Sequence, residues 1–191
     1  MSSDVKSARY PLSLKLKETD QRRATLIEGL KNRDENALQQ LMHLYKNKIF
    51  NYLYLLLKDR ETAEELTQDT FVKAYFKAHT LKTHNINPWL YKIATNLARS
   101  QWRKNRIKTF VPLPDSHREV FSFFPRFEEE LVTRETIDRI PEKYRIPFIL
   151  KTLRDFSYED ISQILNKPVG TVKSLVFRAK AKIRKEYEIP T

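Results

Sequence analysis

The sequence predicts an all-α protein with two small helical domains joined by a flexible linker. Apolar residues recur at helical spacing over most of the 191 residues, glycine occurs only twice, and strand-like alternation is rare. Periodicity is lost over about residues 107–127, where Pro112, Pro114 and Pro125 break any helix. We therefore expect domains over residues 21–106 and 128–191, preceded by a polar arm over residues 1–20.

The net charge and the amino-acid composition indicate which kinds of partner and site to expect. Lys and Arg outnumber Asp and Glu by 36 to 24, and the resulting net charge of +12 favours nucleic acid as the partner. Cysteine is absent, which excludes disulfides and thiolate metal sites and fits a reducing cytoplasm. The longest apolar run, Tyr52 to Leu57, is far too short to span a bilayer. We expect a cytoplasmic protein.

Nothing in the motif pattern indicates catalysis. The four histidines lack metal-ligand spacing, no glycine-rich phosphate loop is present, and no carboxylate cluster accompanies the basic segments. We expect no metal, no cofactor and no enzymatic activity.

The N-terminal domain is expected to open with core helices. Between Leu26 and Leu57 the apolar spacing predicts either one helix hairpin or a short helix followed by a longer one. A further helix should run over about residues 59–78. The expected inner stripe of that helix consists of Ala63, Leu66, Thr70 and Ala74.

The outer face of this further helix is acidic in an otherwise basic protein. Helical geometry projects Glu65, Gln68, Asp69 and Val72 to one side. The helix dipole favours acids in the first turn, which explains Glu61 but not the positions further along. From the residues alone, a protein-binding face and a solvated face are equally supported.

The next helix should be basic and aromatic. Residues 80–87 read as a loop, and Pro88 marks the start of a helix whose Lys and Arg residues alternate with aromatic side chains up to residue 110. Cations beside aromatic rings suit single-stranded or melted nucleic acid, although the same rings suit a core. We expect Trp89 to be mostly buried and Trp102 to be more exposed.

The C-terminal domain should end in two helices around a tight turn. Ser157 is expected to cap the first helix, and residues 166–170, with Pro168 and Gly170, to form the turn. The second helix has a predicted buried stripe of Val172, Val176, Ala179 and Ile183. The opposite face carries Ser174, Phe177, Arg178 and Ala181.

This second helix is strongly basic. Between Lys167 and Lys185 there are seven Lys or Arg and no acid. A basic helix taken alone is more often a solvated surface, but the preceding helix and turn favour a helix-turn-helix that reads the DNA major groove.

These segments together resemble one family, the extracytoplasmic-function (ECF) group of bacterial sigma-70 RNA polymerase sigma factors. The resemblance covers most of the chain. It is carried by DRETAEELTQDTFVKAYF at 59–76, PWLYKIATNLARSQWRK at 88–104 and IPEKYRIPFILKTLRDFSYEDISQILNKPVGTVKSLVFRAKAKIRK at 140–185.

The resemblance implies a specificity subunit of RNA polymerase. Its first domain would bind the clamp of the largest polymerase subunit and melt the −10 promoter element; its second would meet the flap of the second-largest subunit and read the −35 element. Matching clamp-binding residues are Glu64, Glu65, Gln68 and Asp69. Matching −10 residues are Asn85, Asn87, Asn96, Arg99 and Arg103. Matching −35 residues are Thr171, Lys173, Ser174, Phe177 and Arg178.

The family also implies an anti-sigma protein as a partner, which would hold the chain inactive and in some cases at the membrane.

Two positions depart from the family pattern: Leu175 stands where Arg is frequent, and Ser100 where Asp is common. The rival hypothesis is a stand-alone helix-turn-helix regulator that binds an operator without polymerase.

Overall fold

The computed structural model describes the backbone of residues 12–81, 85–108 and 134–186, and side chains within 21–81, 85–105 and 136–185. All regular secondary structure in these ranges is helical, as the sequence predicts. The N-terminal half consists of α1 (Leu12–Lys31), α2 (Glu35–Leu57), α3 (Arg60–Lys77), η1 (Ala78–Thr80) and α4 (Ile86–Lys108). The C-terminal half consists of α5 (Arg134–Arg139), α6 (Glu142–Phe148), η2 (Ile149–Leu153), α7 (Tyr158–Leu165) and α8 (Val169–Glu186).

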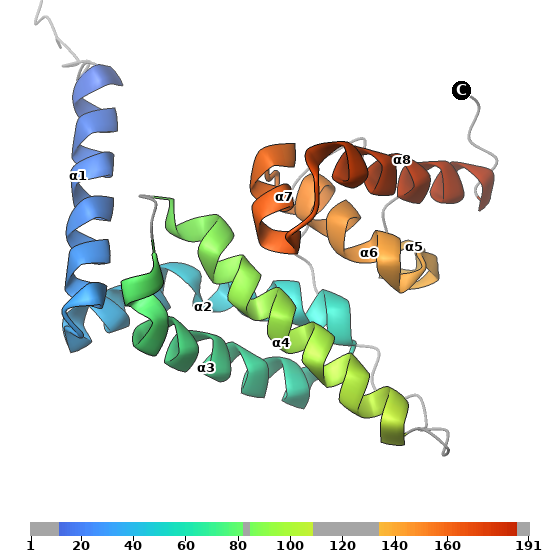
Figure 1. Cartoon of the computed structure of the whole chain (residues 1–191), viewed down its shortest axis with the longest axis horizontal. Coiled ribbons are helices and arrows are strands. Elements are labelled where there is room, and N and C mark those ends of the chain that lie inside the picture. Colours follow the sequence, from blue (N-terminus) through green and yellow to red (C-terminus); the bar gives the residue numbers. More distant parts are fainter. Residues whose placement is uncertain (1–11, 82–84, 109–133, 187–191) are drawn as a thin grey trace, which may run out of the picture.

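Helix α1 differs from the sequence expectation. The polar arm expected over residues 1–20 is helical from Leu12 onward, and residues 1–11 lie outside the described residues. The sequence of this stretch has no regular apolar stripe, yet it is rich in Leu, Lys and Glu, which favour helix by intrinsic propensity. Figure 1 shows α1 standing across one end of the N-terminal domain.

The α1–α2 corner depends on a close backbone approach. A Cβ placed on Gly29 would lie 2.7 Å from the Ala37 Cβ, closer than two such atoms approach in proteins, so only glycine fits there. Asp34 then caps α2, because its carboxylate accepts a hydrogen bond from the Asn36 N–H at 2.9 Å. The region thus contains two helices that meet at a corner, with α1 across the end of α2 and not antiparallel to it as in a hairpin.

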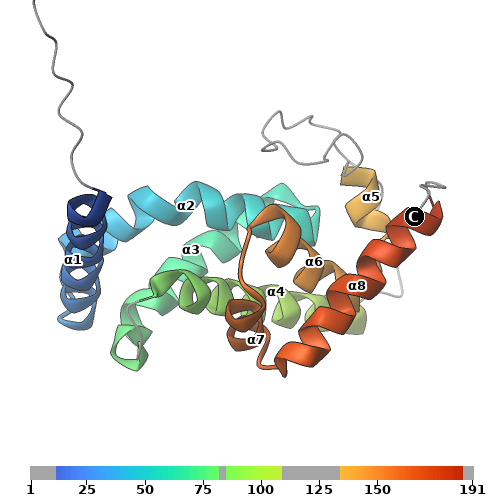
Figure 2. The same ribbon diagram turned by 90° about the horizontal axis from the view of Figure 1, so that it is seen from above.

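The core of the N-terminal domain lies between α2, α3 and α4 (Figures 1 and 2). The predicted inner stripe of α3 is confirmed, since Ala63, Leu66, Thr70 and Ala74 are all buried. Helix α4 presents Leu90, Ala94 and Ala98 to this core. Because the spacing of these residues repeats every three to four positions, the opposite side of α4 is left facing outward.

A buried hydrogen-bond chain joins α2 to α4. The Tyr52 hydroxyl lies 2.7 Å from Thr95 Oγ1, and Thr95 donates its own proton to the Tyr91 carbonyl at 2.7 Å. A hydroxyl has one proton, so Tyr52 is the donor to Thr95. Burial raises the pKa of Tyr52 well above its usual value, which keeps the phenol protonated and able to donate.

The C-terminal domain contains a local departure from regular helix. Pro147 lies inside α6 and supplies no N–H, and the chain continues as the π-helical segment η2. There the Arg154 N–H reaches back five residues to the Ile149 carbonyl at 3.1 Å, and Asp155 adopts a left-handed φ of 51°. This widened turn ends the helix and directs the chain into α7.

The predicted linker, residues 107–127, lies outside the described residues apart from its first two positions, which extend α4 to Lys108. The N-terminal and C-terminal halves, which precede and follow residues 109–133, are in contact with each other. Helix α7 lies beside α4 in both views (Figures 1 and 2).

The buried Tyr52–Thr95 bond gives a stability prediction. Thr95→Val keeps the side-chain shape but removes the acceptor, so the buried Tyr52 hydroxyl loses its partner, at an expected cost of about 1–3 kcal/mol in unfolding free energy. Urea denaturation followed by tryptophan fluorescence measures this, because both tryptophans lie on α4. The double variant Tyr52→Phe/Thr95→Val should recover much of the loss. Equal stability of Thr95→Val and the unsubstituted protein would contradict the assignment.

Candidate nucleic-acid interface

The paired helices α7 and α8 form the expected helix-turn-helix. Ser157 caps α7: its hydroxyl accepts from the Asp160 N–H at 3.0 Å and donates to the Asp160 carboxylate at 2.8 Å. The capping prediction is therefore confirmed. The apolar residues Ile161, Ile164 and Leu165 are buried, which fixes α7 beneath α8.

The turn lies within the expected residues 166–170 but is shorter, because α8 already begins at Val169. Asn166 adopts the left-handed conformation, with φ 51°, and ends α7. Ser162 braces the turn by donating to the Lys167 carbonyl at 2.6 Å. Gly170 was expected in the turn, but it lies within α8 without a positive φ. An asparagine tolerates left-handed φ better than most residues, so the turn does not need glycine.

Helix α8 separates its two faces as predicted. Val172, Val176, Ala179 and Ile183 are buried, whereas all five residues matched to −35 reading are exposed. Phe177 is 70% exposed, the largest value among the exposed large apolar side chains of the described residues. A large apolar group held in water is unfavourable, which favours a partner surface over this face.

Polar contacts orient parts of this face. Ser174 donates to the Gly170 carbonyl at 3.0 Å, which leaves its oxygen lone pairs directed outward. The Lys173 ammonium lies 5.6 Å from the Tyr158 ring centre. Arg178 lies near Tyr144 of α6: the pKa of Tyr144 is lowered, first by Lys143 and further by the Arg178 guanidinium. The cations of α8 are thus held over the domain surface, directed away from the core.

The second set of residues lies on α4, apart from Asn85, which directly precedes it. Asn85 and Asn96 are exposed, Arg103 is exposed, and Asn87 and Arg99 are half-buried. The structure places Asn87 in the first turn of α4 and not in the expected loop; residues 82–84 of that loop lie outside the described residues. Trp89 and Trp102 are both half-buried, so the expected difference between them is not observed.

An open pocket gathers several of these side chains. It has a volume of about 490 Å³ and is lined by Asn96, Arg99, Trp102, Arg103 and Glu142. Four of these residues come from α4, whereas Glu142 comes from α6 in the C-terminal half. No pattern in the sequence points to Glu142, because its position in the pocket depends on how the two halves pack.

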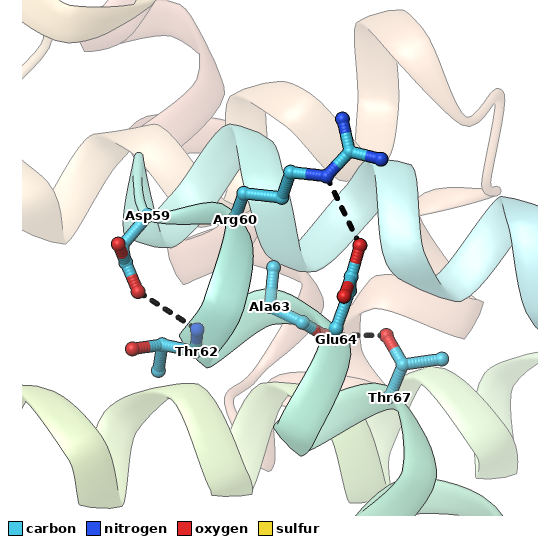
Figure 3. A network of polar contacts seen from close by, with 6 residues as sticks. All are labelled: Asp59, Arg60, Thr62, Ala63, Glu64 and Thr67. Carbon is cyan, nitrogen blue, oxygen red and sulfur yellow. Dashed lines mark hydrogen bonds and ion pairs between the residues drawn. The ribbon is translucent and has the colours of Figure 1, made fainter. Parts of the chain in front are cut away.

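The outer face of α3 is the third candidate surface. Asp59 caps the helix by accepting from the Thr62 N–H at 2.7 Å, and Glu64 pairs with Arg60 at 3.0 Å (Figure 3). Glu64 is therefore neutralised within its own helix and lies on the flank. Glu65 and Gln68 are exposed and Asp69 is half-buried.

Two exposed apolar residues extend this acidic face. Val72 is 53% exposed and Phe76 is 56% exposed, and they are one helical turn apart. Phe76 stands four residues after Val72 in the sequence, and this spacing alone places both on one side of the helix. Acidic and apolar groups side by side are typical of a protein-binding surface.

Two absences hold for the residues that the structure describes. No helix in them combines the length and apolar character needed to cross a bilayer. Nor do they bring together three side chains of the kinds that ligate metal ions.

Comparison with protein families matches both halves of the chain. The description "Sigma-70 region 2" covers residues 41–107, and "Sigma-70, region 4" covers residues 131–183. The chain belongs to the sigma-70 family. Within this sigma factor, the first match spans α3 and α4, and the second spans the helix-turn-helix.

Curated relatives place it in the ECF subfamily. It is 29% identical over 175 residues to the ECF RNA polymerase sigma factor SigW of Bacillus subtilis, covering 84% of this chain and 94% of the relative. It is also 29% identical over 184 residues to the RNA polymerase sigma-H factor of Pseudomonas aeruginosa, covering 87% and 94%. The chain is thus an ECF sigma factor, which directs promoter-specific transcription initiation by RNA polymerase.

Solved structures share the fold. The sigma factor RpoE in complex with the anti-sigma factor NepR, from Bartonella quintana, matches with a TM-score of 0.67 at 24% identity, over 80% of this chain and 98% of that chain. CnrH in complex with the cytosolic domain of CnrY matches with a TM-score of 0.63 at 15% identity, over 87% and 97%.

The turn geometry of this sigma factor gives a matched pair of substitutions. Gly170→Ala adds a Cβ with nothing within 4 Å, at a helical position, so it should stabilise the protein by about 0.5–1 kcal/mol. Asn166→Ala forces alanine into a left-handed φ and should destabilise it by about 1 kcal/mol. Thermal unfolding measures both, with Asn166→Gly as the control that retains stability. A loss of stability in Gly170→Ala together with no loss in Asn166→Ala would contradict the assignment of the turn.

Proposed function

We propose that this sigma factor divides promoter reading between α8 and α4, each using the residues matched to the family. The observation that carries the proposal is the separation of faces on α8: an apolar stripe is buried while Phe177, Arg178 and their neighbours are presented to solvent. A helix of this kind fits the major groove, where cations and polar groups reach base edges.

In the −35 assignment, Thr171, Lys173, Ser174, Phe177 and Arg178 contact the upstream element. Arg178 is the candidate for a bidentate contact with guanine, and Phe177 for apolar contact with a thymine methyl or a sugar. Leu175, which replaces a frequent Arg, is half-buried on the helix flank. We assign its departure from the family to a lost phosphate contact and not to a changed base contact.

In the −10 assignment, Asn85, Asn87, Asn96, Arg99 and Arg103 hold the opened strand. This assignment is supported by the pocket on α4, which is lined by Asn96, Trp102 and two arginines, Arg99 and Arg103. Unstacked bases bind well to surfaces that combine cations with aromatic rings, and stacking contributes about 1–3 kcal/mol per base.

In the polymerase assignment, Glu64, Glu65, Gln68 and Asp69 bind the clamp of the largest subunit, and the C-terminal domain meets the flap of the second-largest. The support is the acidic face of α3 in a protein whose net charge is +12, together with its adjacent exposed Val72 and Phe76. An acidic face on a basic protein selects a basic partner surface.

The remaining parts of the proposal concern the cellular setting. The protein acts in the cytoplasm without catalysing a reaction of its own, since the polymerase supplies the chemistry. An anti-sigma factor is proposed as its inhibitor, by analogy with RpoE and CnrH, whose solved structures contain NepR and CnrY.

Run-off transcription with purified core polymerase on a genomic library tests the proposal. Transcripts should appear at a defined set of start sites only when the protein is added. A stand-alone regulator would instead bind its operator tightly without polymerase. Absence of any start site that depends on the protein would refute the proposal.

A matched pair tests the reading face of α8. Arg178→Ala removes a proposed base contact and should reduce discrimination between a −35 element and a scrambled one by about 1–3 kcal/mol. Lys182→Ala, on the exposed flank of the same helix, should weaken binding to both DNAs alike and reduce the salt dependence. Binding is measured by fluorescence anisotropy with holoenzyme at several salt concentrations. If Arg178→Ala lowers both affinities equally, the base-reading role is wrong.

A further inference from the structure

One aromatic ring of α7 lies against a cation of the helix proposed to read the −35 element. The Lys173 ammonium of α8 lies 5.6 Å from the centre of the Tyr158 ring, and the Lys151 ammonium of η2 lies 5.3 Å from the same centre. Both distances are within the range of about 6 Å over which the face of an aromatic ring attracts a cation. Tyr158 therefore connects three segments of the C-terminal domain: η2, α7 and α8.

The position of the Tyr158 ring is fixed by contacts that do not involve α8. Tyr158 is the first residue of α7, directly after the Ser157 cap, and its side chain is half-buried against the core. Lys151 is held in turn, because its ammonium donates to the Phe156 carbonyl at 3.1 Å and lies 4.0 Å from the Asp155 carboxylate. The ring is thus in place before α8 meets any partner.

The backbone of Lys173 is equally well fixed. Val172 and Val176 are buried, which sets the rotation of α8 about its own axis, and the Val172 N–H donates to the Pro168 carbonyl at 3.1 Å. Lys173 itself is exposed, one helical turn before Phe177. Its four-carbon stem is flexible, so without support the ammonium would occupy many positions and would lose that freedom on binding.

A cation that is held in advance binds at a smaller entropic cost. A cation–π contact at an exposed site favours the bound position of a side chain by about two- to fivefold. The contact with the ring therefore concentrates the Lys173 ammonium at one place on the surface, and pre-organisation of this kind strengthens binding without adding charge.

We propose that Tyr158 is a positioning residue for promoter reading: its ring holds the Lys173 ammonium at the place from which Lys173 contacts the −35 element. The contact of Lys173 with DNA rests on the proposed function, whereas the hold of the ring on Lys173 does not. Because Tyr158 acts through Lys173, removal of the ring should have no effect on DNA binding when Lys173 is absent.

Nuclear magnetic resonance on the free full chain tests the contact without DNA. Protons held over the face of an aromatic ring resonate upfield. The Hε protons of Lys173 should therefore lie upfield in the unsubstituted protein and in Tyr158→Phe, and should return to the usual lysine position in Tyr158→Leu. Lys173→Met identifies the signal by its loss. The signal of Lys151, which lies over the same ring, should move in the same way and is the positive control. A Lys173 signal that is the same with and without the ring would overturn the proposal.

Binding to promoter DNA, taken from a start site that run-off transcription identifies, tests the role. With holoenzyme, Tyr158→Leu should weaken binding by about two- to fivefold, although the net charge is unchanged. Tyr158→Phe should bind as well as the unsubstituted protein, since phenylalanine also presents a ring face to a cation. Thermal unfolding checks that Tyr158→Leu is folded under the assay conditions.

A double-mutant cycle separates positioning from a direct contact of Tyr158 with DNA. Tyr158→Leu should have no further effect in a Lys173→Met background, whereas it should keep its full effect in a Lys182→Ala background. Lys182 lies nine residues, or about 13 Å, further along α8, far enough for the two effects to be independent. Equal losses from Tyr158→Leu in the two backgrounds would show that Tyr158 does not act through Lys173.

Failure of this inference and failure of the proposed function give different results. A ring-dependent Lys173 resonance without any start site that depends on the protein would remove the promoter role together with the proposed function. A ring-independent resonance with normal transcription would overturn the inference and leave the proposed function intact.

Discussion

One helix carries the constraint on which the rest of this structure depends. Helix α4 buries an apolar side against α2 and α3, while Asn96, Arg99 and Arg103, which we propose as contacts to the opened promoter strand, lie on its other side. A helix of 3.6 residues per turn does both only if its rotation about its own axis is fixed. The Tyr52–Thr95 bond helps to fix it, because a rotation that turned Thr95 away would leave a buried phenol without its acceptor.

The same constraint explains why α4 interacts with the C-terminal domain. The outer side of α4 carries a row of cations and a half-buried tryptophan. Two kinds of partner bind such a surface favourably: nucleic acid, or acidic and aromatic protein side chains. The C-terminal half supplies the latter through Glu142 and Phe156. Its other face, on α8, remains basic and free of acid between Lys167 and Lys185. Two acids of this domain, Asp138 and Glu142, thus face the N-terminal half, whereas Asp155 and Glu159 are exposed to solvent.

The sequence predicts well whatever depends on local periodicity. The buried stripes of α3 and α8 follow from spacing alone, because each stripe packs within its own domain and the sequence repeats over several turns. The Ser157 cap is likewise local. Local alternatives of similar chemistry are harder to separate: both Asn166 and Gly170 are able to end a helix, and only the backbone shows that Asn166 takes the left-handed position. Helix α1 extends to Leu12 for a related reason, since propensity without an apolar stripe leaves little signal in the pattern.

The sequence alone does not predict which residues of the two domains come into contact. Glu142, Asp138 and Phe156 each have an adequate local explanation, as a first-turn acid, a surface acid and a core aromatic, so none of them points toward α4. Their contacts with the N-terminal half appear only in the structure, where the Asp138 carboxylate lies 3.0 Å from Lys58 and Glu142 lines one pocket with Arg99 and Arg103. Two acids, Glu65 and Asp69, lie on the outer face of α3, and two more, Asp138 and Glu142, lie where the C-terminal half meets the N-terminal half. The second pair depends on the packing of the two halves, so periodicity within one helix could not have identified it.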